Sequence, residues 1–220
     1  MKITLKQIAE NFDCNQDDFS PAFVAFFNSI DMSYEKLSPK ERDNVLLEII
    51  NKLETDKQKI AAPERTKVWF DGWKENLISF LDKKDINQIV PKFIRPNKIV
   101  RYNGDFIKPN NPYFERDFAK LIQIFCHDKF IKNYSTDNVY EFGCGSSFNL
   151  VNIINLDREY NRSFYGSDFV ESSVELCESL SEHFNLNLKG YLFDMMNPDT
   201  SIRIKENSSV FTFGAIEQLD

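Results

Sequence analysis

The chain lacks the marks of a membrane, secreted or zinc-binding protein. No apolar run reaches the roughly 18 residues that a membrane-spanning helix needs, and the first residues have no apolar signal core. The cysteines, Cys14, Cys126, Cys144 and Cys177, include no CxxC pair, which argues against a zinc site or a disulfide framework. We therefore expect a cytoplasmic protein without a metal and without membrane partners.

A surplus of positive charge and a pattern of metal-binding histidines are also missing. The chain has 27 Lys+Arg against 34 Asp+Glu, a net charge of −7, and no long basic run, so we expect no nucleic-acid partner. The two histidines, His127 and His183, lack a second ligand at suitable spacing and are interpreted as surface or interface residues. With 220 residues, 42% of them hydrophobic, the chain can bury one large core or two smaller ones.

Residues 1–90 are predicted to form an all-helical N-terminal domain. Ser38 and Glu41 form a Ser-x-x-Glu capping box with Pro39 at the first helical position, and apolar residues follow at helical spacing. Three further helices are expected over residues 5–12, 21–30 and 64–81. The aromatic residues of the last helix, including Trp73, are interpreted as core packing.

Residues 91–112 are predicted to connect two domains. Prolines and an Asn-Gly pair interrupt any helix there: Pro91, Pro96, Asn103-Gly104, Pro109 and Pro112. The segment also carries the basic residues Lys92, Arg95, Lys98 and Arg101. They would suit an acceptor with phosphate or carboxylate groups, although charged linker residues are more often simply solvated. Together with Tyr102 and Tyr113, Arg101 is a candidate for closing over a binding site.

Residues 113–220 are predicted to form an α/β domain. After a helix that begins near residue 113, strands are expected over 139–142, 164–167, 190–193 and 210–213, with helices over 149–156 and 172–184. This order predicts a Rossmann-like parallel sheet with helices on both faces and a ligand site beyond the carboxyl ends of the strands. The expected fold class is therefore α/β, preceded by the all-helical domain.

A glycine turn follows the first predicted strand of that domain. Gly143 and Gly145 permit a sharp turn and close approach of a ligand, and the next helix would present free N–H groups. In the dinucleotide pattern GxGxxG the third glycine would fall on Phe148, which weakens an NAD interpretation. The stretch Glu141-Phe-Gly-Cys-Gly-Ser-Ser147 instead resembles the first motif of class I S-adenosylmethionine-dependent methyltransferases, with Ser147 in place of the third glycine.

Three later stretches resemble further motifs of that family, in its order. The acid of Phe164-Tyr-Gly-Ser-Asp168-Phe169 would accept hydrogen bonds from the ribose hydroxyls. In Gly190-Tyr-Leu-Phe-Asp194-Met195 the acid would contact the adenine amino group, and a neighbouring amide would bind the ring. The end of the strand at 210–213 would lie beside the methyl group and the substrate. S-adenosylmethionine is thus the implied cofactor and S-adenosylhomocysteine the implied product.

The resemblance assigns a role to each site residue. Glu141 would attract the ammonium group of the cofactor, and the amides of the turn would bind its carboxylate. Phe169 would cover the adenine ring, and Glu217 is the candidate general base for a small acceptor, anionic or sugar-like. The thiol of Cys144 is interpreted as structural and not as a nucleophile. The implied cofactor-binding residues are Glu141, Gly143, Cys144, Gly145, Ser147, Asp168, Phe169, Asp194, Met195 and Phe213.

Other interpretations stay open at this point. Glu141 would also serve to cap neighbouring backbone groups, Asp168 as the N-cap of the helix that follows it, and Asp194 as an ordinary turn residue. A noncatalytic S-adenosylmethionine-binding scaffold and an NAD-dependent oxidoreductase are the alternative functions. Because the family's sheet has seven strands, we expect the chain to be a truncated piece with an open sheet edge at 210–213, through which it could form oligomers.

Overall fold

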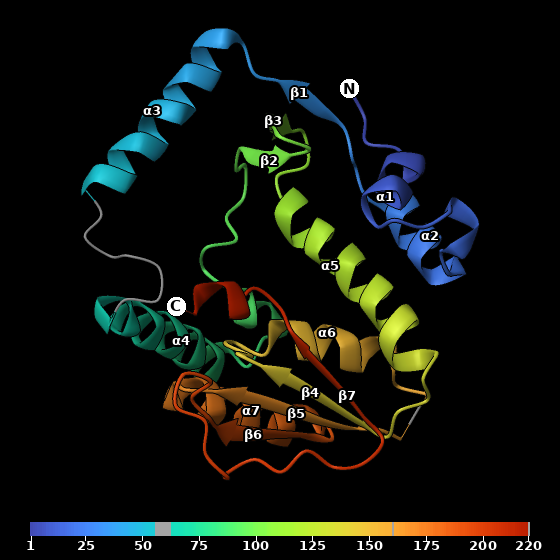
Figure 1. The fold of residues 1–220 in the computed structure, drawn as a ribbon, viewed down its shortest axis with the longest axis vertical. Helices are drawn as coiled ribbons and strands as arrows, with labels where there is room; N and C mark the ends of the chain where they lie inside the picture. The colour runs from blue at the N-terminus through green and yellow to red at the C-terminus, as the bar shows by residue number, and fades with distance from the viewer. Residues whose placement is uncertain (56–62, 160, 220) are drawn as a thin grey trace. The chain divides into compact units, whose positions relative to one another are not determined.

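The computed structural model describes residues 1–55, 63–159 and 161–219, with side chains omitted at 63–65 and 217. The chain divides into two compact units (Figure 1). One unit holds residues 1–55 and Ile94–Phe125, and the other holds residues 63–93 and 126–219. No helix in these described stretches combines the length and the hydropathy needed to cross a lipid bilayer.

The first unit contains helices and a small antiparallel sheet. Its elements are α1 (Leu5–Asn11), η1 (Gln16–Asp18), α2 (Pro21–Ser29), β1 (Tyr34–Lys36), α3 (Pro39–Thr55), β2 (Val100–Tyr102), β3 (Asp105–Pro109) and nearly all of α5 (Phe114–Cys126). The three strands pair in the order β1-β3-β2. The expectation of an all-helical N-terminal region is therefore wrong at β1.

The segment expected as a linker contributes a hairpin to this sheet. Asn103 and Gly104 join β2 to β3 with φ values of 47° and 87°, a conformation in which an Asn-Gly pair is strongly favoured. The antiparallel register runs from Val100 opposite Ile107 to Tyr102 opposite Asp105. The Asn-Gly pair thus forms a tight turn between strands, where the sequence analysis had placed only a connector.

The second unit is an α/β fold with a parallel sheet. Its elements are α4 (Pro63–Lys83), η2 (Ile86–Ile89), η3 (His127–Lys132), β4 (Asn138–Phe142), α6 (Phe148–Leu156), β5 (Ser163–Asp168), α7 (Glu171–Phe184), β6 (Leu188–Leu192), β7 (Ser208–Thr212) and η4 (Ile216–Gln218). The strands are parallel and lie in the order β6-β5-β4-β7. This order confirms the Rossmann-like α/β fold class. The direction in which successive strands are added reverses between β4 and β7, and such folds bind ligands at that point, beyond the carboxyl ends of the strands.

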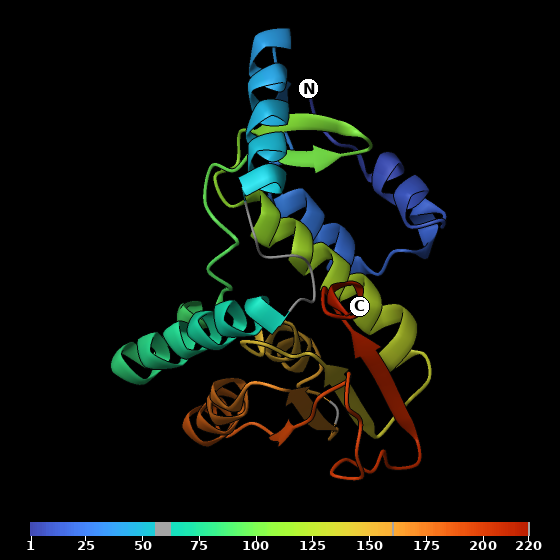
Figure 2. The ribbon, with the colours of Figure 1, turned by 60° about the vertical axis from the view of Figure 1, so that its left-hand side comes forward.

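Helices cover one face of this sheet closely. On β5, Gly166 leaves room for Cys144 and Leu150, whose atoms lie 2.9 and 3.0 Å from where a Cβ would stand. On β6, Gly190 leaves room for α7, because a Cβ at this position would lie 2.9 Å from the carbonyl oxygen of Val174. Figure 2 shows α6 and α7 on the same side of the sheet. Glycine in these two strands therefore allows close helix packing on the face that also carries Glu141.

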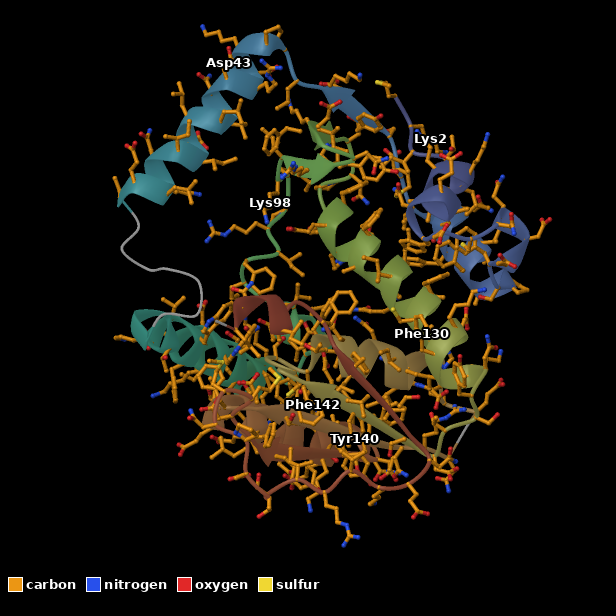
Figure 3. All side chains as sticks on the ribbon, in the orientation of Figure 1. Lys2, Asp43, Lys98, Phe130, Tyr140 and Phe142 are labelled. Carbon is orange, nitrogen blue, oxygen red and sulfur yellow. The ribbon has the colours of Figure 1, made fainter. Side chains whose placement is uncertain are left out.

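The opposite face of the sheet is aromatic. The rings of Tyr140 and Tyr165 stack with centroids 4.4 Å apart, and Tyr191 lies 6.0 Å from Tyr165. Tyr140 and Phe142, labelled in Figure 3, belong to β4 and point to this face. Residues 193–207, which lead from β6 to β7, contain no helix among the described elements. Helices on both faces were expected, but this crossover does not provide one.

The compact units divide the chain differently from the predicted ranges 1–90, 91–112 and 113–220. Helix α4 lies in the second unit and packs along α7, where Phe80 contacts His183 and Phe184 at 5.9 Å between ring centroids. Helix α5, up to Phe125, lies in the first unit. An amphipathic pattern shows that a helix has a buried face but does not identify the partner of that face.

Candidate functional site

The turn between β4 and α6 adopts the same left-handed backbone at three alternate residues. The φ angles are 72° at Gly143, 53° at Gly145 and 61° at Ser147, which is the N-cap of α6. The amides of Gly143 and Cys144 both donate to the carbonyl oxygen of Ser167, at 2.8 and 2.9 Å. Ser147 therefore adopts the conformation for which glycine is preferred, and the turn is tied to the end of β5.

Neighbouring side chains pack tightly against both glycines. A Cβ at Gly143 would lie 2.3 Å from the Cβ of Ala215 and 3.4 Å from the methyl carbon of Met195. A Cβ at Gly145 would lie 2.7 Å from the indole ring of Trp73 on α4. The turn therefore meets segments that follow β6 and β7, and also a helix that precedes the sheet.

Glu141 is the last residue but one of β4, and its side chain is fully buried. One carboxylate oxygen accepts a hydrogen bond from the Asn149 side-chain amide at 2.7 Å. The other oxygen, Oε2, is buried without a hydrogen bond of ordinary geometry, as is the hydroxyl of Ser146 in the turn. Burial raises the pKa of Glu141 to about 8, against the lowering effect of the Asn149 hydrogen bond, and the charge of Asp168 adds to the rise.

Asp168 ends β5 on the same face of the sheet as Glu141 and is also buried. Its Oδ2 accepts from the Gly145 amide at 2.8 Å, and its Oδ1 accepts from the Val170 amide at 3.0 Å. Burial raises the pKa of Asp168 to about 6, although these amides lower it. The N-cap of α7 is Val170, which receives no side-chain cap bond, so Asp168 is not the N-cap of that helix. Its carboxylate instead binds backbone amides of the glycine turn and of its own turn.

The two buried carboxylates have no protein cation as a partner. No ion pair among the described residues includes Glu141 or Asp168. The described residues also contain no group of three or more potential metal ligands. Buried charges in proteins are usually paired, so this end of the sheet is suited to a ligand that carries positive charge.

The third and fourth motifs are placed at the same end of the sheet. After β6, Asp194 accepts from the Met196 amide and the Asn197 side chain, both at 2.8 Å, as the turn residue of the alternative interpretation would do. Met195 reaches Gly143, and Phe213 precedes Gly214 in the segment that brings Ala215 to the turn. Glu217 lies in η4, but its side chain is outside the described residues.

Cys144 and Phe169 differ in their surroundings. The thiol of Cys144 is buried against Gly166, and burial raises its pKa well above the ordinary thiol range, so it stays protonated and is poorly suited to nucleophilic attack. Phe169 is 37% exposed, and its ring lies 6.0 Å from that of Phe70 on α4. It is thus positioned beside Asp168 with part of its surface free.

His127 is not a surface residue, which corrects the sequence-based interpretation. Its Nε2 lies 2.8 Å from Oδ1 of the buried Asp157, and its Nδ1 lies 3.3 Å from Asp128. Arg162 also binds Asp157 and donates to the Thr136 carbonyl at 2.6 Å. The cluster joins η3, the end of α6 and the start of β5, and its charges are satisfied internally. It is therefore a structural element of the second unit.

A cavity of about 240 Å³ lies elsewhere, in the first unit. It is lined by residues of β2 and α5 and by Lys98, which pairs with Glu115 at 2.8 Å. Arg101 and Tyr102, expected to close over a binding site, line this cavity. Glu141 and Asp168 do not line this cavity, so we place the candidate site at the glycine turn.

Two contributors to the site were not predicted from the sequence. Asn149, in the first turn of α6, donates a hydrogen bond to Glu141 and orients it. In the sequence, only its position eight residues after Glu141 could have indicated this contact. Trp73 was interpreted as core packing, but it is half-buried and lies on the glycine turn. No sequence pattern links α4 to that turn, because the contact depends on how α4 packs against the sheet.

No protein-family profile matches the chain, and no curated protein matches it significantly.

Proposed function

We propose that this chain binds S-adenosylmethionine and transfers its methyl group to a small-molecule acceptor. The observation that carries the proposal is the pair of buried carboxylates, Glu141 and Asp168, beside a left-handed glycine turn at the carboxyl end of a parallel sheet. The pair has no described counter-ion. The cofactor would supply the cationic groups and donors that these acids lack.

The residues at the turn fit different parts of the cofactor. Oε2 of Glu141, which accepts no hydrogen bond of ordinary geometry, suits the ammonium group, and the Asp168 carboxylate suits the ribose hydroxyls. The N-terminal end of α6, which begins at Phe148, favours a carboxylate. Phe169 offers an exposed ring to the adenine, and Met195 and Phe213 would border the site.

The chemistry required of the protein is mainly positioning. The bound cofactor supplies a methyl group on a sulfonium centre, which is already a good leaving group. Correct alignment of acceptor and donor contributes about 7–11 kcal/mol in favourable cases. Glu217 is proposed as the base for an acceptor that must lose a proton. The acceptor itself is proposed to be anionic or sugar-like.

Calorimetric titration with S-adenosylhomocysteine tests the cofactor assignment. Asp168→Asn keeps the size of the side chain and removes its charge, so we expect Kd to rise about 10- to 100-fold. Asp199→Asn is the matched control, because Asp199 is an exposed acid of the same unit that accepts a hydrogen bond from the Ser201 amide in its own loop. Unchanged affinity in Asp168→Asn, with normal affinity in the control, would contradict the proposal.

Two further measurements separate the alternatives. Titration with NAD distinguishes a dinucleotide site, which would bind NAD in preference to S-adenosylhomocysteine. Transfer of a labelled methyl group to a panel of small metabolites and sugars distinguishes an enzyme from a noncatalytic scaffold. We expect binding of S-adenosylhomocysteine, no binding of NAD, and transfer that Glu217→Gln reduces if the acceptor is a hydroxyl.

We also propose a cytoplasmic location. None of the four cysteines forms a disulfide, and Cys144 and Cys177 are buried within the second unit. Free thiols are typical of a reducing compartment.

A further inference from the structure

Trp73 on α4 is the side chain that covers Gly145 in the glycine turn. Its indole carbons stand 2.7 to 3.0 Å from the position that a Cβ of Gly145 would occupy. The ring therefore rests directly on the Gly145 backbone, whose amide donates to Asp168. Any ligand that binds Asp168 and approaches this amide comes next to the indole or displaces it.

The indole belongs to a group of aromatic rings that the protein leaves partly exposed. Trp69 stacks on Trp73 with centroids 5.7 Å apart, and Phe93 meets Trp73 edge-on at 6.5 Å. Phe93 is 53% exposed. From the same helix, Phe70 reaches Phe169, the residue after Asp168. Helix α4 thus presents aromatic side chains to the segment that follows β4 and to the segment that follows β5.

An exposed aromatic surface beside a polar site indicates a planar ligand. Such a patch is unfavourable in water and commonly marks a binding site. Purine rings stack on indole and phenyl rings, and the stacking is worth about 1–3 kcal/mol by alanine substitution in nucleic-acid complexes. A charged group that could bind the ligand is also present, because the Asp168 carboxylate binds the Gly145 amide and Asp168 directly precedes Phe169.

We infer that Trp73 is a cofactor-binding residue, and that the adenosine part of the ligand stacks on its indole ring at Gly145. The inference rests on the proposed function and extends the site to α4, which lies before the whole sheet in the sequence. Trp69 and Phe93 pack against the indole and need not contact the ligand.

The chain suits a direct optical test, since Trp69 and Trp73 are its only two tryptophans. In Trp69→Phe the emission comes from Trp73 alone, and we expect S-adenosylhomocysteine to quench it or shift its maximum with the same Kd that calorimetry gives. Trp73→Phe, which leaves Trp69 as the reporter, should show a much smaller change. By calorimetry, Trp73→Ala should raise Kd about 10- to 100-fold and Trp73→Phe less than 10-fold.

The outcomes separate this inference from the proposed function. If the wild type does not bind S-adenosylhomocysteine in the calorimeter, both fail. Should the wild type bind while Trp73 emission stays constant and Trp73→Phe and Trp73→Ala keep full affinity, Trp73 only packs and the inference alone fails. Thermal melting of each variant checks that it is folded, and the optical signal of Trp69→Phe gives an answer even if Trp73→Ala does not fold.

Discussion

At the scale of single residues, Glu141 is the most unusual group in the structure. Its carboxyl is fully buried, receives one side-chain hydrogen bond and has no cationic partner among the described residues. Its pKa is raised to about 8, mainly because burial disfavours the charged form. A folded-state pKa above the ordinary value of 4.5 means that the folded protein holds this proton more tightly than the unfolded chain.

The stability of the protein should therefore fall as the pH rises between about 4.5 and about 8. The contribution of the Glu141 proton is fully present below the unfolded pKa and is lost as the pH passes the folded one. Glu141→Gln keeps the side-chain shape without the ionisable group, so it should be more stable than the wild type at about pH 8, by on the order of 4 kcal/mol. Urea unfolding at several pH values measures this difference.

Asp168 and His127 provide the comparison for this pH dependence. Both pKa values are raised, for Asp168 by burial and for His127 by its bonds to Asp128 and Asp157 that outweigh the burial effect. Both therefore also favour folding at lower pH, and the slope that remains in Glu141→Gln should come from them. An unchanged slope in Glu141→Gln would show that Glu141 is ionised in the fold without cost. The variant should also bind S-adenosylhomocysteine more weakly, because an amide cannot ionise to pair with the ammonium group of the ligand.

At the scale of elements, α4 shows how a helix with ordinary local features acquires a particular place. Its residue Gly72 lies in the helix interior, and nothing stands within 4 Å of the position of a Cβ. Its neighbour in sequence, Trp73, covers the glycine turn. A change at Gly72 therefore alters the helix without altering the site.

Gly72→Ala should stabilise the protein by about 0.5–1 kcal/mol, because alanine loses less backbone entropy than glycine in a helix. Chemical unfolding measures the gain, and ligand affinity should stay unchanged. The matched substitution Gly145→Ala should destabilise the protein, since φ is 53° and the added Cβ would lie 2.7 Å from Trp73. A loss of stability in Gly72→Ala would argue that α4 is not an ordinary helix at this position.

At the scale of the whole molecule, the parallel sheet has an edge at β7. This strand pairs with β4, and no other described strand pairs with it. Val210, in the middle of β7, is 51% exposed. Edge strands with exposed apolar residues favour association with other chains unless a charge or a covering element prevents it.

We expect the protein to associate at high concentration through this edge, and Val210→Lys to reduce the association, because a lysine on an edge strand opposes pairing. Light scattering after size-exclusion chromatography, at several concentrations, measures the effect. Arg203→Lys, in the preceding crossover, is a control that keeps the charge. A wild type that remains monomeric at every concentration would refute this prediction.

Local sequence signals predicted much of the fold. The capping box at Ser38 and Glu41 is present, with the Glu41 amide donating to the Ser38 hydroxyl at 3.3 Å and the Ser38 amide donating to the Glu41 carboxylate at 2.8 Å. The alternation after residue 138 correctly predicted the strands and helices of the parallel sheet. In contrast, Asn103-Gly104 was a missed hairpin signal, although the pair is favoured in such turns. Its strands are short, and three prolines nearby obscured the pattern.

The sequence by itself determined where the chain turns and which residues carry charge at those turns. Left-handed backbone at Gly143 and Gly145 follows from residue type, and so does the position of Glu141 at the end of a strand. Only the tertiary structure decided that both acids are buried on one face and that Trp73 lies on Gly145. The physical reason is that backbone preference is local, whereas burial and its effects on pKa depend on which distant segments exclude water from a group.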